Sequence, residues 1–210
     1  ALTWGNGFLF HPMDLFNPFS PTDVERDYKI GDDMVTFQAH TSAGEIQMLY
    51  VPRRQPATGN VTRDQSSAAA KYHRYVGNLE IDLMAAVHYD DIVAAAGMVG
   101  YLGGAAWRLD AAYTWLDQAE NRNGFADICL NLDYSWVWFG KNMYGWIEYY
   151  YTGLGTDNYE KALADPDIME RIRREERFTL GRSYLDANLQ VELHPLVNFN
   201  LTLITNTQDS

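Results

Sequence analysis

The segment ADICLNLDYSWVW, Ala126–Trp138, decides the fold. Apolar and aromatic side chains occupy every second position: Ala126, Ile128, Leu130, Leu132, Tyr134, Trp136 and Trp138. Polar or small side chains lie between them: Asp127, Cys129, Asn131, Asp133 and Ser135. A period of two is typical of a β-strand whose two faces meet different surroundings. Because this alternation continues well beyond the roughly five or six residues of a usual strand, the segment predicts a long strand with one apolar face.

The same alternation recurs along most of the chain. The clearest further cases are 78–89, 105–116, 185–193 and 197–203, and weaker ones are 34–41, 45–51, 67–76, 92–100 and 142–152. We expect about eleven strands in a single domain, 1–210. Because even counts are the rule in complete bacterial barrels, this number favours a piece of a larger barrel.

The connections between these strands differ in length in a regular way. Short turns are predicted at 42–44, 76–78, 102–104, 140–142 and 194–195. Longer connections alternate with them at 11–33, 53–65, 116–124 and 153–180, with one short exception at 90–91. Short turns on one side and long loops on the other are typical of an antiparallel transmembrane β-barrel. The alternative is a soluble all-β fold, whose strands are usually shorter.

One helix is predicted within the longest connection, near 165–177. Asp165, Pro166 and Asp167 resemble a helix start, and Ile168, Met169 and Ile172 form an apolar stripe beside a charged face. This short helix either caps the mouth of the barrel or packs on its rim.

Composition narrows the class of protein further. The formal net charge is −12, so no basic face for nucleic acid is present, and lipid, cations or neutral solutes are the expected partners. Aromatic residues make up 14% of the chain and gather near predicted strand ends, where interfacial girdles lie. No apolar stretch approaches the roughly 18 residues of a membrane helix, so any crossing must use strands.

The sequence contains no recognisable catalytic or metal-binding motif. Nucleophile-elbow, phosphate-loop and zinc signatures are absent, the five histidines are scattered, and the single cysteine has no ligand partner at metal spacing. We therefore expect no enzyme activity, no cofactor and no metal.

The polar faces of the strands supply the candidate lining of a pore. The collected residues are Lys71, Glu80, Asp82, Arg108, Asp110, Asp127, Asp133, Glu148, Asp186 and Glu192. An excess of carboxylates between low-dielectric walls favours cations. The alternative is structural, because Arg108 and Asp110 lie one strand away from Asp127 and Asp133 and can form cross-strand ion pairs.

A proline-rich stretch near the N-terminus forms a candidate mouth or constriction loop. Pro12, Pro18 and Pro21 prevent a continuous strand, and the polar residues among them are His11, Asp14, Asn17 and Asp23. The loop either folds inward to shape the opening or simply connects two strands.

The opening run also carries a resemblance. Trp4, Gly5, Asn6, Gly7 and Phe8, followed by His11 to Pro18, resemble a motif of several poorly characterised Gram-negative outer-membrane β-barrel families, porin-like in character, in which a Trp-Gly strand end precedes an Asn-Pro-x-Asp loop. Here His11 replaces the usual Asn. The stretches 31–34 and 50–53 extend the likeness over roughly the first quarter of the chain. The resemblance implies an outer-membrane location and a transport role, and it supplies no catalytic residues.

Together these observations predict a porin-like outer-membrane barrel through which small solutes diffuse, with a preference for cations. Two alternatives stay open: a structural barrel that sheathes an electron-transfer or export partner, and a soluble all-β binding protein. A homo-oligomer or a partner protein is compatible with the porin-like barrel and with the structural barrel. No signal peptide precedes Trp4 and no terminal aromatic strand ends the chain, so we expect a fragment or a processed protein.

Overall fold

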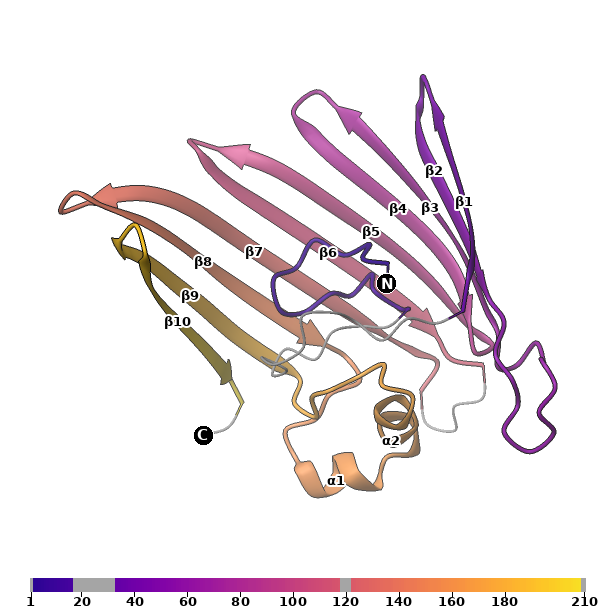
Figure 1. Ribbon diagram of the computed structural model, residues 1–210. Coiled ribbons are helices and arrows are strands. Elements are labelled where there is room, and N and C mark those ends of the chain that lie inside the picture. Colours follow the sequence, from indigo (N-terminus) through magenta and orange to yellow (C-terminus); the bar gives the residue numbers. More distant parts are fainter. Residues whose placement is uncertain (1, 17–32, 118–121, 209–210) are drawn as a thin grey trace.

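The computed structural model describes residues 2–16, 33–117 and 122–208. Its strands form one antiparallel sheet in which each strand pairs with the next along the chain (Figure 1). They are β1 (Val35–Thr41), β2 (Gly44–Val51), β3 (Ser67–Val76), β4 (Leu79–His88), β5 (Asp91–Leu102), β6 (Ala105–Trp115), β7 (Gly124–Trp138), β8 (Lys141–Thr152), β9 (Ser183–His194) and β10 (Val197–Asn206). The all-β antiparallel prediction is confirmed. The expected eleven strands are ten within the described residues.

The connections follow the predicted asymmetry. Two-residue turns join β1 to β2, β3 to β4, β5 to β6, β7 to β8 and β9 to β10, all at the upper end of the sheet in Figure 1. Gly103 and Gly104 both have positive φ, the backbone that a tight hairpin between right-twisted strands requires. The longer connections lie at the opposite end, where Tyr89 and Asp90 form the one short turn. We call these the turn end and the loop end.

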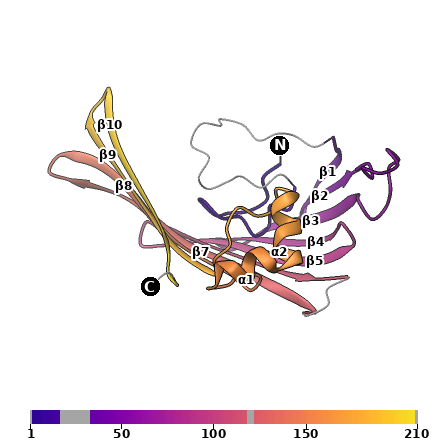
Figure 2. The ribbon, with the colours of Figure 1, turned by 90° about the horizontal axis from the view of Figure 1, so that it is seen from below.

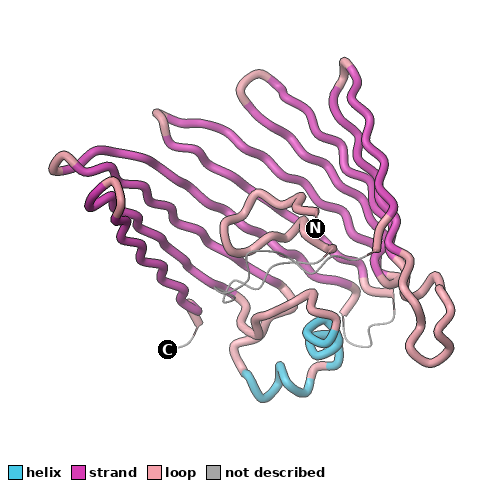
Figure 3. Tube along the Cα trace, in the orientation of Figure 1, coloured by secondary structure: helices cyan, strands magenta, loops and turns pink. Residues whose placement is uncertain are grey.

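The connection from β8 to β9 contains two helices, where the sequence predicted one. These are α1 (Tyr159–Ala164) and α2 (Pro166–Arg173). Asp165 caps α2 as predicted, since its side chain accepts from the backbone N–H groups of Asp167 and Ile168. Asn158 caps α1 in the same way, and this signal was missed. Both helices lie at the loop end (Figure 3).

The sheet exposes apolar side chains on one face and buries polar side chains on the other. The sheet is curved, and Figure 2 shows the N-terminal segment on its concave side. Large apolar side chains on the convex face are exposed, among them Leu83, Ile92, Leu130, Ile147 and Leu185 at 49–57%. Polar side chains on the concave face are buried, among them Asp82, Asp110, Asn131, Glu148 and Asp186. A soluble protein places these two classes the other way round.

The apolar core lies between the N-terminal segment and the concave face. Trp4, Met13 and Phe16 are buried against small and apolar side chains of β2 to β6, including Val51 and Met84. Trp4 and Gly5 were expected at a strand end. They lie instead in a segment without strand pairing, because the backbone N–H groups of both residues bond to the side chain of Asp14 in the same segment.

The sheet has two terminal strands in the described part of the chain. β1 and β10 stand at the ends of the strand order, and both are exposed on both faces along most of their length. The described strands therefore establish the antiparallel sheet but not its closure into a barrel. No helix among the described residues is long and apolar enough to span a membrane.

Candidate functional site: a docked segment on a polar concave face

The N-terminal segment 4–16, which we call the docked segment, is tied into a loop by its own aspartate. Asp14 is 5% exposed, and its Oδ1 accepts from the backbone N–H groups of Trp4 at 2.5 Å and Gly5 at 3.1 Å. His11 lies at the bend, where its carbonyl accepts from the N–H of Asp14. The predicted inward-folding loop thus includes His11 and Asp14 on the concave side, whereas Asn17 and Asp23 lie outside the described residues.

Asp110 on β6 holds the first part of the docked segment. Its Oδ2 accepts from the backbone N–H of Asn6 at 2.6 Å, and its Oδ1 accepts from the Asn6 side-chain amide at 2.8 Å. Gly97 pairs with Asp110 on the neighbouring strand β5. A Cβ at Gly97 would lie 2.8 Å from Asn6 Nδ2, 2.8 Å from Asp110 Oδ1 and 3.0 Å from Met13 Sδ. The absence of a side chain at Gly97 therefore makes room for the segment.

We expect Gly97→Val to displace the docked segment while the sheet persists. Valine suits a strand, but its side chain would overlap the atoms that Asn6 and Met13 contribute, at a cost of about 1–3 kcal/mol. The measurement is hydrogen exchange of the amides of residues 4–10, which should become faster. Ala96→Val, which adds bulk on the exposed face of the same strand, is the matched control. Unchanged exchange in Gly97→Val would show that the close approach does not position the segment.

Glu148 on β8 holds the second part of the docked segment. Its Oε2 accepts from the N–H of Phe8 at 2.5 Å, and its Oε1 accepts from the N–H groups of Leu9 and Phe10, both at 2.9 Å. Asn131 donates from its side-chain amide to Glu148 at 3.3 Å and to the Asn6 carbonyl at 3.2 Å. Three consecutive backbone amides on one buried carboxylate form a compact set of charge-assisted hydrogen bonds.

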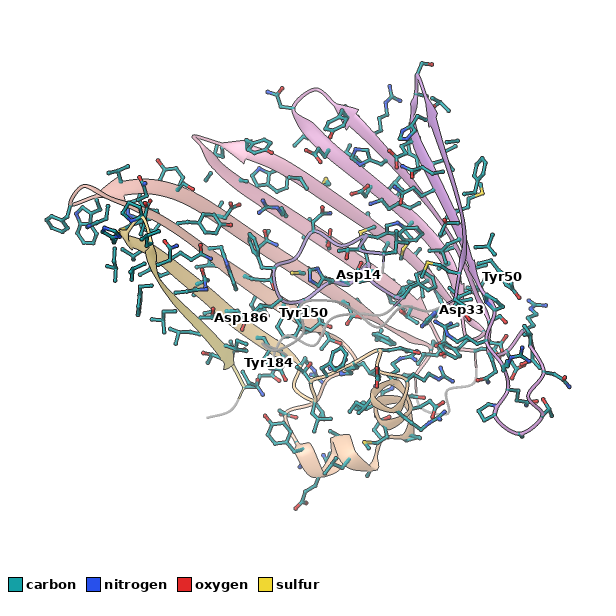
Figure 4. The ribbon with its side chains drawn as sticks, in the orientation of Figure 1. Asp14, Asp33, Tyr50, Tyr150, Tyr184 and Asp186 are labelled. Atoms are coloured by element: carbon teal, nitrogen blue, oxygen red, sulfur yellow. The ribbon has the colours of Figure 1, made fainter. Side chains whose placement is uncertain are left out.

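Aromatic stacking fixes the same stretch sideways. The ring of Phe8 stacks on Trp146 at 4.8 Å between centroids, and the ring of Phe10 stacks on Tyr150 at 4.3 Å. Tyr184 on β9 lies 5.3 Å from Phe10, and Figure 4 shows Tyr150 and Tyr184 close together beneath the segment. Residues 8–10 therefore combine apolar contacts with the carboxylate hydrogen bonds.

The remaining predicted lining residues form local contacts on the same face. Lys71 lies 3.1 Å from Asp82, and Arg108 lies 2.6 Å from Asp133, so the predicted cross-strand pairing holds for Arg108 and Asp133. Asp110, which was expected in that network, binds Asn6 instead. Asp127 is 3.4 Å from the hydroxyl of Tyr150.

The other three predicted residues are spread over the height of the face. Glu80 is half-buried on β4 near the turn end, and Glu192 accepts from Asn142 at 2.6 Å at the same end. Asp186 is fully buried on β9, directly across from Glu148. Asp110 and Glu148 thus bind the docked segment, Asp186 lies beside Glu148, and Glu80 and Glu192 lie near the turn end.

The connection between β8 and β9, residues 153–182, covers the loop end of the concave face, and we call it the cover. An ion-pair network holds it in place. Arg171 lies 2.5 Å from Asp91 and 3.4 Å from Glu176, which follows α2. Glu176 Oε1 lies 3.3 Å from Nε2 of His88, whose Nδ1 is 2.9 Å from the hydroxyl of Ser67. Between this cover and the docked segment the face encloses a cavity of about 110 Å³. The predicted helix, observed as α2, therefore packs at the loop end of the concave face.

The cover should loosen in acid because of Glu176. Burial alone would raise the pKa of Glu176, but the contact with His88 and the charges of Arg171 and Arg174 hold that pKa below its ordinary 4.5. A lowered folded-state pKa stabilises the cover above about pH 4.5, and this contribution is lost as the pH falls through the folded value. Pepsin cleavage within 153–182 should therefore accelerate below pH 4.5.

Two variants test this pH dependence. Glu176→Gln should weaken the cover at neutral pH and flatten the acid response, whereas Glu175→Gln, at an exposed neighbouring position, should behave as the unaltered protein. An equally steep acid response in Glu176→Gln would assign the effect to another group.

Sequence reasoning missed the uncharged members of this site. Asn131 and Asn188 lie on the polar faces of predicted strands, so alternation alone placed them correctly, but only charged residues were collected. Asn6 carried no local signal, because its partner Asp110 lies 104 positions away. The roles of His88 and Glu176 depend on how the β8–β9 connection folds back over β4.

Comparison with protein-family models, curated proteins and solved structures finds no match. In the described part of the chain, no group of three or more His, Cys, Asp or Glu residues is placed to hold a metal ion. The functional assignment consequently depends on the two faces of the sheet and on what covers the concave one.

Proposed function

We propose that this chain forms a transmembrane β-barrel wall, or a large part of one, in a bacterial outer membrane. Small solutes, with a preference for cations, pass on the concave side. The observation that carries the proposal is the reversal of the two faces: apolar side chains are exposed on the convex face, and carboxylates are buried on the concave face. Lipid is the solvent that favours this arrangement, because it accepts an apolar surface without cost.

Aromatic residues at both ends of the convex face support a membrane location. Tyr113 and Trp115 lie near the loop end, and Tyr134 and Trp138 lie near the turn end, all of them 38–58% exposed. Such rings favour the two interfaces of a bilayer, where an apolar ring meets polar headgroups.

The concave face supports passage of cations under control of the docked segment. Asp82, Asp110, Glu148 and Asp186 give this face an excess of negative charge over Lys71 and Arg108. Two of these carboxylates bind backbone amides of the docked segment, so the segment narrows the space beside the wall. Its release widens the path and exposes the charge.

A second candidate is a structural barrel that sheathes an electron-transfer or export partner. The filling of the concave face by the docked segment and by the cover favours this reading, because a filled lumen conducts poorly. The barrel wall is common to both candidates.

The deciding experiment measures ion conductance of the full-length protein, purified from outer membranes in detergent, in planar bilayers. Stepwise conductance with a cation-shifted reversal potential supports the proposed function. A folded, membrane-inserted protein that stays silent excludes passage and leaves the sheath. A chain that remains monomeric and soluble without detergent excludes both.

A further inference from the structure

Asp186 is a buried carboxylate that has no hydrogen-bond or ion-pair partner among the described residues. Its side chain is 0% exposed, and neither carboxylate oxygen has a hydrogen-bond partner. Leaving a buried carboxylate unpaired costs several kcal/mol, so a native protein rarely retains one without a partner.

Asn188 presents a further orphan oxygen two positions along the same face. Its side-chain amide group donates to Asn200 at 2.6 Å and to Thr202 at 2.8 Å, both on β10. With its amide nitrogen on these two partners, the Oδ1 of Asn188 is left buried without a donor. Asp186 and Asn188 together therefore offer three unused acceptor atoms.

The surroundings of this pair are negative. Glu148 stands directly across from Asp186 on β8, and like charges in opposed positions repel. The amides of residues 8–10 and Asn131 already occupy the oxygens of Glu148. No described Lys, Arg or His lies within ion-pair distance of Asp186, so its charged form needs a partner that brings a positive charge and hydrogen-bond donors.

We propose that Asp186 and Asn188 bind a primary ammonium group, –NH3⁺. Such a group has three N–H donors, which match the three orphan acceptors in number. A guanidinium has five donors and would leave some of them unsatisfied. Ca²⁺ requires six to eight oxygen ligands, about twice as many as Asp186 and Asn188 leave unused.

The docked segment lies over this site. Asp186 and Glu148 form one cross-strand pair, flanked by Trp146 opposite Asn188 on one side and Tyr150 opposite Tyr184 on the other. Phe8 stacks on Trp146 and Phe10 stacks on Tyr150, so residues 8–10 cross the pair between them. An ammonium group therefore enters when the segment lifts. The physiological role of this site rests on the proposed function, because the site identifies primary amines as the solutes that pass.

The experiment is an equilibrium titration of the full-length protein in detergent with ethylammonium. Binding is measured by calorimetry and by the shift of the thermal unfolding midpoint. We expect saturable binding of ethylammonium and none of tetramethylammonium, which has the same charge but no N–H donor. Asp186→Asn, which keeps the shape and removes the charge, should weaken binding at least tenfold. Glu192→Gln, a carboxylate on the same strand near the turn end, should leave it unchanged.

Further measurements distinguish a free amine from a lysine side chain, and failure of the binding site from failure of the transport role. A tripeptide with blocked ends and a central lysine tests whether the ammonium group belongs to a protein segment: tighter binding of ethylammonium indicates a free amine, and tighter binding of the tripeptide indicates a lysine. Absence of ethylammonium binding, or equal binding by Asp186→Asn, overturns the site and assigns a proton to Asp186. Because titration in detergent needs no conductance, binding by a silent protein would leave the site standing and remove only the transport role.

Discussion

Replacing Leu130 with arginine should prevent the chain from inserting into lipid vesicles. Leu130 lies in the middle of β7, is 49% exposed on the convex face, and pairs with Leu109 and Tyr149 on the neighbouring strands. Arginine on the lipid face at the middle of a bilayer costs about 2–4 kcal/mol. The measurement is the folded fraction in vesicles along a denaturant titration, which should shift by that amount.

The matched control places the same arginine at the edge of the same face. Leu102 ends β5 beside a turn and is 76% exposed, so Leu102→Arg should cost about 0–1 kcal/mol near the interface. A soluble protein would show a different pattern, because an exposed substitution in water changes stability by roughly 0.5 kcal/mol or less. Equal and small effects at both positions would contradict the membrane wall.

The strands were predictable because their signal is local. In β7 the alternation of apolar and polar residues is continuous, and the observed strand, Gly124–Trp138, extends the prediction by two residues. The turn at Gly103 and Gly104 was predictable for the same reason, since two glycines supply the positive φ of a tight hairpin. Pattern and turn chemistry act within a few residues, and the sequence displays both directly.

The docked segment was not predictable in the same way. Phe8 and Glu148 are 140 positions apart, and no periodicity links a backbone amide to a distant carboxylate. The sequence placed Asp110 and Glu148 correctly on the polar face but assigned them to an open lining. A carboxylate on a polar strand face looks the same in the sequence whether it faces water, a cation or another segment of the chain.

The role of Glu148 leads to the second large expected effect. Glu148→Ala should release residues 4–10 from the concave face, because three backbone amides lose their common acceptor in a buried place. Hydrogen bonds to a charged group contribute about 1.5–3 kcal/mol each and are not additive. We expect a loss of about 3 kcal/mol in docking free energy, or roughly a hundredfold in the ratio of docked to released segment.

Hydrogen exchange of the Phe8, Leu9 and Phe10 amides measures this release directly, and conductance in bilayers reports its consequence. Both should rise in Glu148→Ala. Glu80→Ala is the matched control, since Glu80 lies on the same face near the turn end, away from the contacts of the docked segment. Faster exchange without conductance would mean that the wall is sealed by something other than the segment, which favours the sheath. Protection equal to that of the unaltered protein would mean that the aromatic stacks of Phe8 and Phe10 hold the segment by themselves, and the carboxylate would lose its assigned role.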